Sequence, residues 1–265
     1  MTARDTNVGD IFRAIERSLI EECRTSQPDI EATIEREVGR AGLDDSDDAL
    51  FQKLVMVVFY SGFKAATVTA KRETILKHLG DWRVAREYGP GDVDRIVDDS
   101  AMIGHRRKVE ACIANAKTVA AIVTRCGSFS AYLRDRIGDG ALSDLLVLKE
   151  DLEAEFEYLG GITVYHFMTD LGLNVLKPDR VIMRIFHRLR LVDDTNRYFR
   201  AIQIGQRMAS EAGASMRRVD RVLVAYGQVE TEEFGLAKGI CLEEKPRCTR
   251  CGVRDQCGWR GERGS

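Results

Sequence analysis

The sequence predicts an all-α protein, and three observations support this prediction. Near the N-terminus apolar residues recur at helical spacing, as at Ile11, Ile15 and Leu19, with Glu and Arg between them. Residues 108–123 have the pattern of one long helix. No pair of segments shows the alternation of apolar and polar residues that neighbouring strands require.

Start and stop signals place the individual helices. Residues 44–47 are typical of a helix N-cap, and the apolar run 50–59 that follows them is longer than a typical strand. Asp92 is expected to cap a short helix. Glycines make 127–142 a predicted turn region. The predicted helices are 11–20, 50–59, 92–96, 108–123, 145–158, 163–176 and 180–191.

The composition of the 265 residues fits one large domain or two small ones. No apolar run reaches the roughly 18 residues of a membrane span, and the N-terminus lacks the apolar core of a signal peptide, so we expect a cytoplasmic protein. The formal net charge of −2 hides an asymmetry. Residues 1–50 hold six Lys or Arg against thirteen Asp or Glu, whereas 177–221 hold eleven against five and 238–265 hold seven against four. Two interpretations stay open: a positive face that attracts phosphates, or ordinary solvated helices.

Four of the seven cysteines lie close together near the C-terminus, with six, two and five residues between them. In a reducing compartment such a group indicates a metal site rather than disulfides. Four thiolates on a short loop suit a [4Fe–4S] cluster or a tetrahedral zinc ion, and the spacing alone does not decide between them. The predicted ligands are Cys241, Cys248, Cys251 and Cys257, while Cys23, Cys112 and Cys126 are interpreted as small buried residues.

Basic residues are interspersed among these cysteines, and a loop held by a metal would present them at fixed positions to DNA phosphates. The predicted phosphate contacts are Lys245, Arg247 and Arg250, with Arg254 in the same loop. A second basic stretch begins at His105 and Arg106, at the start of a predicted helix. That stretch is either a DNA-backbone contact or a solvated turn.

The segment 159–163 connects two predicted helices. Gly160 and Gly161 allow a tight turn and a close backbone approach. The following helix would begin near Thr163 and offer free backbone N–H groups, which form a phosphate-binding site at a helix N-terminus. Glycine-linked helix pairs are also common in bundles without any ligand.

A turn at Lys177-Pro178 precedes Asp179, because proline disfavours a helix at the residue before it. Asp179 then lies near the N-terminus of the helix predicted at 180–191. Two interpretations of this carboxylate are possible: a helix cap, or a catalytic group.

These motifs together carry a resemblance. The cysteine spacing resembles the iron–sulfur loop of the endonuclease III and MutY families. The glycine hairpin followed by a turn and an aspartate-headed helix resembles the helix–hairpin–helix (HhH-GPD) DNA glycosylases. This resemblance implies a [4Fe–4S] cluster and a two-lobed fold. Its parts would be N-terminal helices in 1–44, a six-helix barrel in 45–174, and a catalytic-Asp helix with the cluster lobe in 175–265.

A second resemblance is closer in amino-acid sequence. Residues 156–168, 103–111 and 67–73 are similar to the 3-methyladenine DNA glycosylase I family. The sequence departs from that family where Val57 and Ala65 stand near the positions of its pocket glutamate and tryptophan. The zinc-binding termini of that family are also absent, and it lacks the aspartate seen here.

The resemblance implies a mechanism. A glycosylase flips the damaged nucleotide out of the duplex, and a carboxylate stabilises the oxocarbenium-like sugar as the base leaves. Asp179 is the predicted carboxylate. Bifunctional relatives attack the sugar with a lysine, and aligning the hairpins places Tyr165 at that position. A monofunctional enzyme is therefore predicted, although Lys177 leaves lyase chemistry open. The candidates for stacking on the flipped base are Tyr165, His166, Phe59, Tyr60 and Phe63. Ordinary core packing is the favoured alternative for all of them except Tyr165, whose position follows from the alignment.

The expected substrate is an alkylated purine resembling 3-methyladenine, in damaged double-stranded DNA. Deaminated or mismatched pyrimidines (uracil or thymine) are the second expectation, and oxidised bases the third. An alternative of another class is a DNA-binding protein that senses lesions without catalysis. We expect a monomer associated with the nucleoid.

Overall fold

The computed structural model describes residues 7–39, 43 and 45–259. Every regular element in these ranges is a helix, and the one β-bridge pairs Thr231 with Leu236. The all-α prediction is confirmed. None of the helices described is long and apolar enough to cross a membrane.

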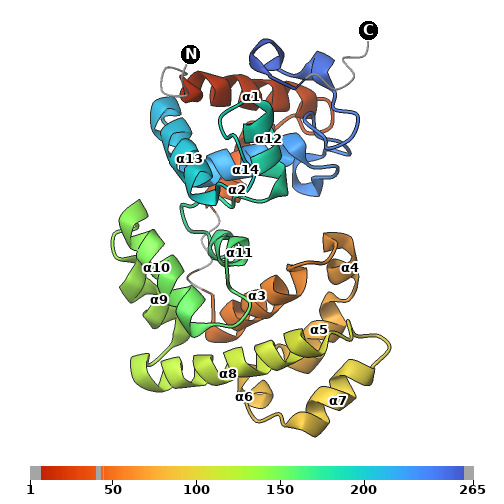
Figure 1. The fold of residues 1–265 in the computed structure, drawn as a ribbon, viewed down its shortest axis with the longest axis vertical. Helices are drawn as coiled ribbons and strands as arrows, with labels where there is room; N and C mark the ends of the chain where they lie inside the picture. The colour runs from red at the N-terminus through yellow and green to blue at the C-terminus, as the bar shows by residue number, and fades with distance from the viewer. Residues whose placement is uncertain (1–6, 40–42, 44, 260–265) are drawn as a thin grey trace. The chain divides into compact units, whose positions relative to one another are not determined.

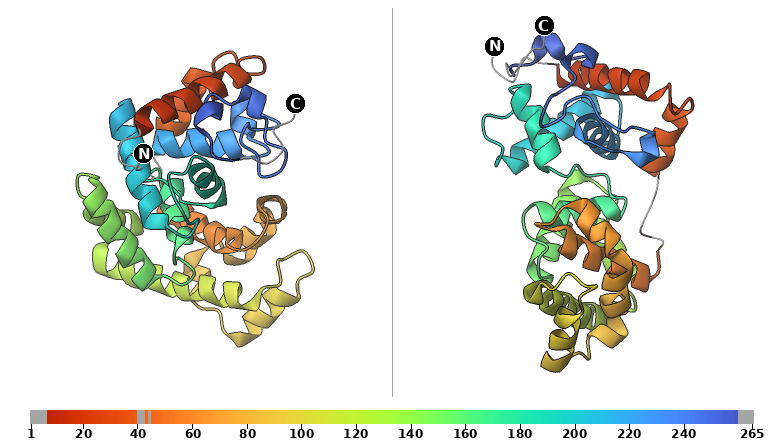
Figure 2. Two further views of the ribbon diagram at one scale, coloured as in Figure 1. Left: turned by 45° about the horizontal axis from the view of Figure 1, so that its top comes forward. Right: turned by 90° about the vertical axis from the view of Figure 1, so that its right-hand side faces the viewer.

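The chain forms two compact units. We call residues 1–40 and 174–265 unit 1, and residues 41–173 unit 2. In unit 1 the first helices of the chain lie against its last segments, as red and blue ribbons show in Figures 1 and 2.

Unit 2 is built around one long helix, α8 (Arg106–Cys126). It packs against α3, α6, α7 and α9, and extends across the unit in Figure 1. The remaining helices of the unit are α3 (Asp47–Tyr60), α4 (Ala65–Ala70), α5 (Arg72–Leu79), α6 (Trp82–Ala85), α7 (Pro90–Asp98), α9 (Phe129–Ile137), α10 (Leu142–Glu155) and α11 (Ile162–Asp170).

Helix α3 forms the core of this unit. The Ser46 side chain accepts the Ala49 N–H and so caps the first turn, whereas Asp44, part of the predicted cap, lies outside the described residues. Eight of its residues are buried, among them the continuous run from Leu54 to Phe59. A helix that is apolar all round must be enclosed by other helices, which explains why the run 50–59 has no polar face.

The prediction of a turn region at 127–142 is wrong for the middle of this segment, which α9 occupies. Ser128 accepts the Ala131 N–H as an N-cap, and Gly138 ends the helix with a positive φ of 55°. The glycines therefore mark the two ends of a helix rather than a continuous turn.

A buried lysine joins three parts of unit 2. Lys108, which is 3% exposed, donates from Nζ to the carbonyls of Val58 and Ser61 at the end of α3. The same ammonium lies over the rings of Phe63 (5.4 Å) and Tyr158 (4.9 Å). It satisfies carbonyls that a helix end leaves unpaired. Burial lowers the pKa of Lys108 to about 8.

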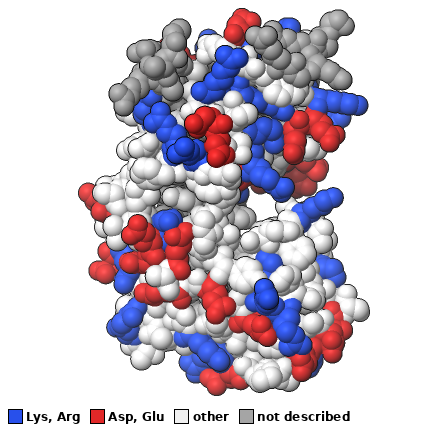
Figure 3. All heavy atoms as spheres, in the orientation of Figure 1, with Lys and Arg blue, Asp and Glu red and all other residues white. Residues whose placement is uncertain are grey.

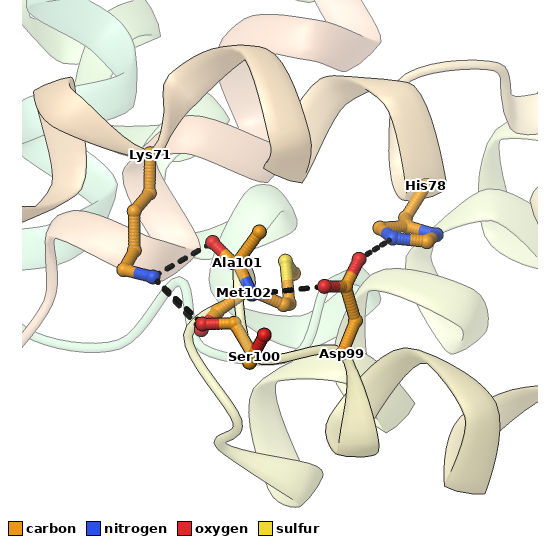
Figure 4. A network of polar contacts seen from close by, with 6 residues as sticks. All are labelled: Lys71, His78, Asp99, Ser100, Ala101 and Met102. Atoms are coloured by element: carbon orange, nitrogen blue, oxygen red, sulfur yellow. Dashed lines mark hydrogen bonds and ion pairs between the residues drawn. The ribbon is translucent and has the colours of Figure 1, made fainter.

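A polar network holds the loop that leads into α8 (Figure 4). Lys71 Nζ donates to the carbonyls of Ser100, Ala101 and Met102, at 3.4, 2.7 and 3.3 Å. Asp99 accepts the Ala101 N–H (2.8 Å) and contacts His78 Nε2 (2.8 Å). The hydrogen bond with His78 lowers the pKa of Asp99, so this contact weakens as the pH falls through that lowered value.

Unit 1 combines the two ends of the chain. Its helices are α1 (Val8–Cys23), α2 (Ile30–Gly39), α12 (Arg180–Arg188), α13 (Tyr198–Ala212) and α14 (Met216–Gly227), followed by short 3-10 turns η1 (Glu232–Phe234), η2 (Cys248–Arg250) and η3 (Arg254–Gln256). Helix α1 packs on α13 and α14, and α12 packs on α14. At the last contact Gly227 lies so close to Val181 that an added Cβ would approach the Val181 side chain to 2.6 Å.

The charge asymmetry of the sequence is partly used inside unit 1. Arg218 of α14 pairs with Glu16 of α1 and Glu35 of α2. Arg221 of the same helix pairs with Glu37, at 3.1 Å. The acidic N-terminal residues thus neutralise part of the basic segment 177–221, so that its charge is not all available to a partner.

The Lys108 contacts lead to a stability prediction. Lys108→Met keeps much of the apolar stem but removes the donor to the buried Val58 carbonyl and the part-buried Ser61 carbonyl, so we expect the free energy of unfolding to fall by about 3 kcal/mol. Chemical denaturation monitored by circular dichroism measures this change. The control is Lys117→Met, the same substitution on the same helix at an exposed residue. Equal stability of the two variants would contradict the proposed bridging role.

Candidate functional site

Asp179 is the N-cap residue of α12. Its Oδ1 accepts the backbone N–H groups of Val181 (2.9 Å) and Ile182 (3.1 Å). Its Oδ2 lies 3.6 Å from Lys177 Nζ, and 24% of the side chain is exposed. The capping interpretation of the sequence is therefore realised in the structure. One carboxylate oxygen is held by the helix, while the other faces the lysine.

A buried carboxylic acid, Asp220, holds the turn before Asp179. Asp220 of α14 accepts the Lys177 backbone N–H at 2.7 Å, and the Asp179 N–H bonds the Lys177 carbonyl at 2.7 Å. Burial raises the pKa of Asp220 to about 6, against the opposing effect of Lys177. No motif pointed to Asp220, because its partners lie 43 residues away in sequence.

The glycine hairpin of unit 2 has the tight turn that the sequence predicts. Gly161 has a positive φ of 61°, and it is the residue before α11. Its N–H donates to Glu153 Oε1 at 2.9 Å, and the N–H of Thr163 bonds the Gly160 carbonyl at 3.2 Å. A phosphate at Gly161 would have to displace the Glu153 carboxylate, which Lys149 also pairs.

The aromatic candidates differ in burial. Phe59 is fully buried and Tyr165 is 6% exposed, so both rings belong to the core of unit 2. Burial raises the pKa of the Tyr165 phenol, with a smaller contribution from Glu153. Tyr60 and His166 are half-buried neighbours, with ring centroids 5.6 Å apart. Phe63 is also half-buried.

The basic start of α8 already has an acidic partner. Arg106 is exposed and forms an ion pair with Asp94 of α7. His105 lies at the N-cap position without a side-chain cap, and its ring meets the edge of Phe63, with centroids 5.9 Å apart. The Arg106 ion pair is exposed, and such pairs contribute little to stability.

The basic residues of the C-terminal loop are distributed between the protein and the solvent. Arg247 pairs with Glu22 of α1 and donates to the Lys238 carbonyl at 3.1 Å. Arg250 approaches the same glutamate at 4.0 Å, while Lys245 is exposed. On the face shown in Figure 3, Lys and Arg side chains lie among Asp and Glu in both units.

Two arginines of α12 hold residues 241–257, which we call the cysteine segment. Arg184 donates to the carbonyls of Gly227 (2.6 Å) and Cys241 (3.1 Å). Arg188, 7% exposed, donates to the Leu242 carbonyl at 2.6 Å and to the Glu243 carbonyl at 2.9 Å. Helix α12 thus connects the Asp179 turn at its first residue to the cysteine segment along its length.

The four cysteines of this segment line one small cavity together with Arg188 and Trp259. Arg188 Nη1 donates to Cys241 Sγ at 3.3 Å, and Cys257 Sγ donates to the Arg188 carbonyl at 3.5 Å. Burial raises the pKa of the Cys241 and Cys251 thiols. In the ranges that the structure describes, no group of three or more His, Cys, Asp or Glu residues could hold a metal ion.

Comparison with known proteins identifies the family. The model of the methyladenine glycosylase family matches residues 24–177, more than half of the chain. The chain belongs to the methyladenine glycosylase family. A DNA-3-methyladenine glycosylase of Haemophilus influenzae is 27% identical over 157 residues, which cover 52% of this chain and 83% of that protein. The members of this family are DNA N-glycosylases, and so is this chain.

Two solved structures give weaker likenesses. A variant of 3-methyladenine DNA glycosylase I in complex with 3-methyladenine is 23% identical, with a TM-score of 0.44, covering 51% of this chain and 80% of that one. A variant of the Staphylococcus aureus enzyme is 22% identical, with a TM-score of 0.45 and the same coverage.

The prediction of a [4Fe–4S] cluster is wrong. The methyladenine glycosylase family has no such cluster, and the described cysteines form no metal-binding group. The spacing of the cysteines along the chain suits a cluster, but the family to which the chain belongs does not carry one. In the structure Cys241 and Cys257 bond to Arg188 instead.

The family match ends at residue 177, before Asp179 and the cysteine segment. It includes the hairpin, the start of α8 and Tyr165. The family therefore establishes the class of enzyme, while the roles of the individual residues stay predictions.

We expect Arg188→Met to release the cysteine segment. The substitution removes the donors to two carbonyls and to Cys241, so the free energy of unfolding should fall by about 3 kcal/mol, and the thiols should react faster with a maleimide reagent. Arg180→Met, the same change on the exposed face of the same helix, is the control. If both variants label at the wild-type rate, Arg188 does not hold the segment.

Proposed function

We propose that the protein is a monofunctional DNA glycosylase of base excision repair that removes alkylated purines such as 3-methyladenine from double-stranded DNA. The observation that carries this proposal is the family match over residues 24–177. The Haemophilus influenzae relative, which bears the name of that activity, supports it. An alkylated purine carries a positive charge, so its base leaves readily and needs little further activation.

Asp179 is the proposed catalytic carboxylate. As the base leaves, the sugar becomes oxocarbenium-like, and a fixed negative charge close to it lowers the barrier. The two N–H bonds to Oδ1 hold the carboxylate in place. Oδ2, which faces Lys177, would then stabilise the sugar or orient the attacking water. Capping and catalysis are therefore compatible roles for one side chain.

The monofunctional assignment rests on Tyr165 and Lys177. A phenol forms no imine with the sugar, and Tyr165 is buried in unit 2. Lys177 Nζ lies 3.6 Å from Asp179, and an ammonium in an ion pair has no free electron pair for attack. Strand cleavage by the enzyme itself is therefore not part of the proposed reaction.

We also propose the finer fold description. Unit 2 would be the six-helix barrel, with the hairpin before α11 as the helix–hairpin–helix element. The positive φ of Gly161 supports this assignment. The hairpin residues Gly160, Gly161 and Thr163, together with His105, Arg106, Lys245 and Arg250, would contact the DNA backbone.

Deaminated or mismatched pyrimidines are the second candidate substrates. Val57 is fully buried in α3 and Ala65 is exposed at the start of α4, near the positions of the family's pocket glutamate and tryptophan. Neither side chain provides the negative charge or the flat ring that would favour a cationic base. These two residues therefore favour uncharged bases such as uracil or thymine as the second class of substrate.

A panel of oligonucleotide duplexes tests the proposed function. Each duplex carries 3-methyladenine, 7-methylguanine, uracil, a thymine mismatch or an oxidised pyrimidine, and alkali cleaves any abasic site formed. We expect excision of the alkylated purines first, and a reduction of about a thousandfold in the excision rate for Asp179→Asn with unchanged DNA affinity. Binding without excision of any lesion would favour a lesion-sensing protein instead.

Borohydride trapping tests the absence of lyase chemistry. We expect no covalent adduct between the protein and a duplex from which the damaged base has been removed, because neither Tyr165 nor the paired Lys177 forms an imine. A bifunctional glycosylase treated in parallel shows that the trapping works. An adduct that disappears in Lys177→Met would identify Lys177 as a nucleophile and refute the monofunctional assignment.

A further inference from the structure

Asp220 is a carboxylic acid inside a helix–helix contact. It lies on α14, is 5% exposed, and its neighbours Val219, Val222 and Leu223 are fully buried. An unpaired carboxylate at such a position is costly, and an apolar residue would satisfy the packing equally well. The presence of an acid here therefore calls for a specific partner.

That partner is the backbone of the turn before α12. Asp220 Oδ1 accepts the Lys177 N–H at 2.7 Å, across 43 residues of sequence. Proline at 178 has no N–H of its own, and the Asp179 N–H is already bonded to the Lys177 carbonyl. The Asp220 bond therefore connects the turn to α14 in unit 1.

We propose that Asp220 is a positioning residue for base excision: its buried carboxyl fixes the turn that presents Lys177 and Asp179 to the substrate. This inference rests on the proposed function, because it assumes that Asp179 acts in excision. Asp220 itself would not touch the DNA or the reacting atoms.

The charges around Asp220 connect its ionisation to Asp179. Lys177 and Asp179 act on it from the turn, and Arg221 acts on it from its own helix. Each helix packed against α14 contributes charged side chains that already have a partner. These are Glu16 of α1 with Arg218, Glu37 of α2 with Arg221, Arg207 of α13 with Glu211, and Arg184 of α12 with the Gly227 and Cys241 carbonyls.

The consequence is a pH dependence of a definite sign. Burial raises the pKa of Asp220 to about 6. Below that pH Asp220 is neutral, and the Lys177 ammonium is attracted to Asp179 alone. Above it the Asp220 carboxylate competes for the same ammonium, which frees Asp179 Oδ2 to face the sugar. The excision rate should therefore rise as the pH passes upward through about 6.

Two variants of Asp220 separate its hydrogen bond from its charge. Asp220→Asn retains an acceptor for the Lys177 N–H but does not ionise, whereas Asp220→Ala removes the acceptor. Asp193→Asn, at an exposed acid of unit 1, is the matched control. Each protein is assayed on the best duplex of the lesion panel for single-turnover rate and Kd between pH 5 and 8, and for thermal unfolding.

We expect Asp220→Ala to lower the single-turnover rate at least about tenfold while Kd changes less than twofold, because a displaced turn misplaces Asp179 but not the DNA. Asp220→Asn should retain the rate that the wild type shows at pH 5 and lose the increase near pH 6. The control should keep the wild-type profile. If Asp220→Ala does not fold, the pH profile of Asp220→Asn decides the question.

The inference is overturned if Asp220→Ala excises at the wild-type rate, or if Asp220→Asn keeps the same pH step. An equal loss of rate and affinity would indicate a structural role alone and would also overturn it. Asp179→Asn, assayed in parallel, tests the catalytic role of Asp179 separately from the positioning role of Asp220. Wild-type excision by that variant would refute the catalytic role of Asp179, whereas its inactivity beside a fully active Asp220→Ala would refute this inference only.

Discussion

The cap that the Asp179 carboxylate forms on α12 is the interaction on which the proposed site of unit 1 depends. Two backbone N–H groups hold Oδ1 at the first turn of the helix. The same helix then carries Arg184 and Arg188 to the carbonyls of the cysteine segment. Because a short helix is marginal without capping and packing, the Asp179 cap supports the helix that holds the cysteine segment, while Asp220 holds the turn before it.

Ion pairs within unit 1 neutralise part of the charge asymmetry that the sequence shows. The acidic N-terminal stretch and the basic stretch after residue 177 are far apart in sequence, yet Glu16, Glu35 and Glu37 pair with arginines of α14. The excess of positive charge in a sequence segment therefore does not tell how many cationic side chains are exposed to DNA. Lys245 is exposed to solvent, whereas Arg247 is already paired with Glu22.

Local signals predicted much of the fold. The predicted 180–191 is α12 (Arg180–Arg188) and the predicted 108–123 lies within α8, because cap residues and apolar spacing are local. No prediction covered α13 or α14, although both have an apolar face. For the site, sequence indicated Asp179 through its turn, but Asp220 and Lys108 act through contacts across 43 to 50 residues, which no local pattern reveals. The cluster prediction was wrong because it rested on cysteine spacing alone, whereas the family of this chain has no such cluster.

The order of the two units along the chain has a consequence for synthesis. Unit 2 is one uninterrupted segment, whereas unit 1 is split into 1–40 and 174–265. A nascent chain folds as its segments leave the ribosome, so unit 2 is complete while α1 and α2 still await α13 and α14. The apolar faces of those first two helices are then exposed throughout translation of the intervening segment. The length of the segment between them thus sets how long α1 and α2 wait for their partner helices.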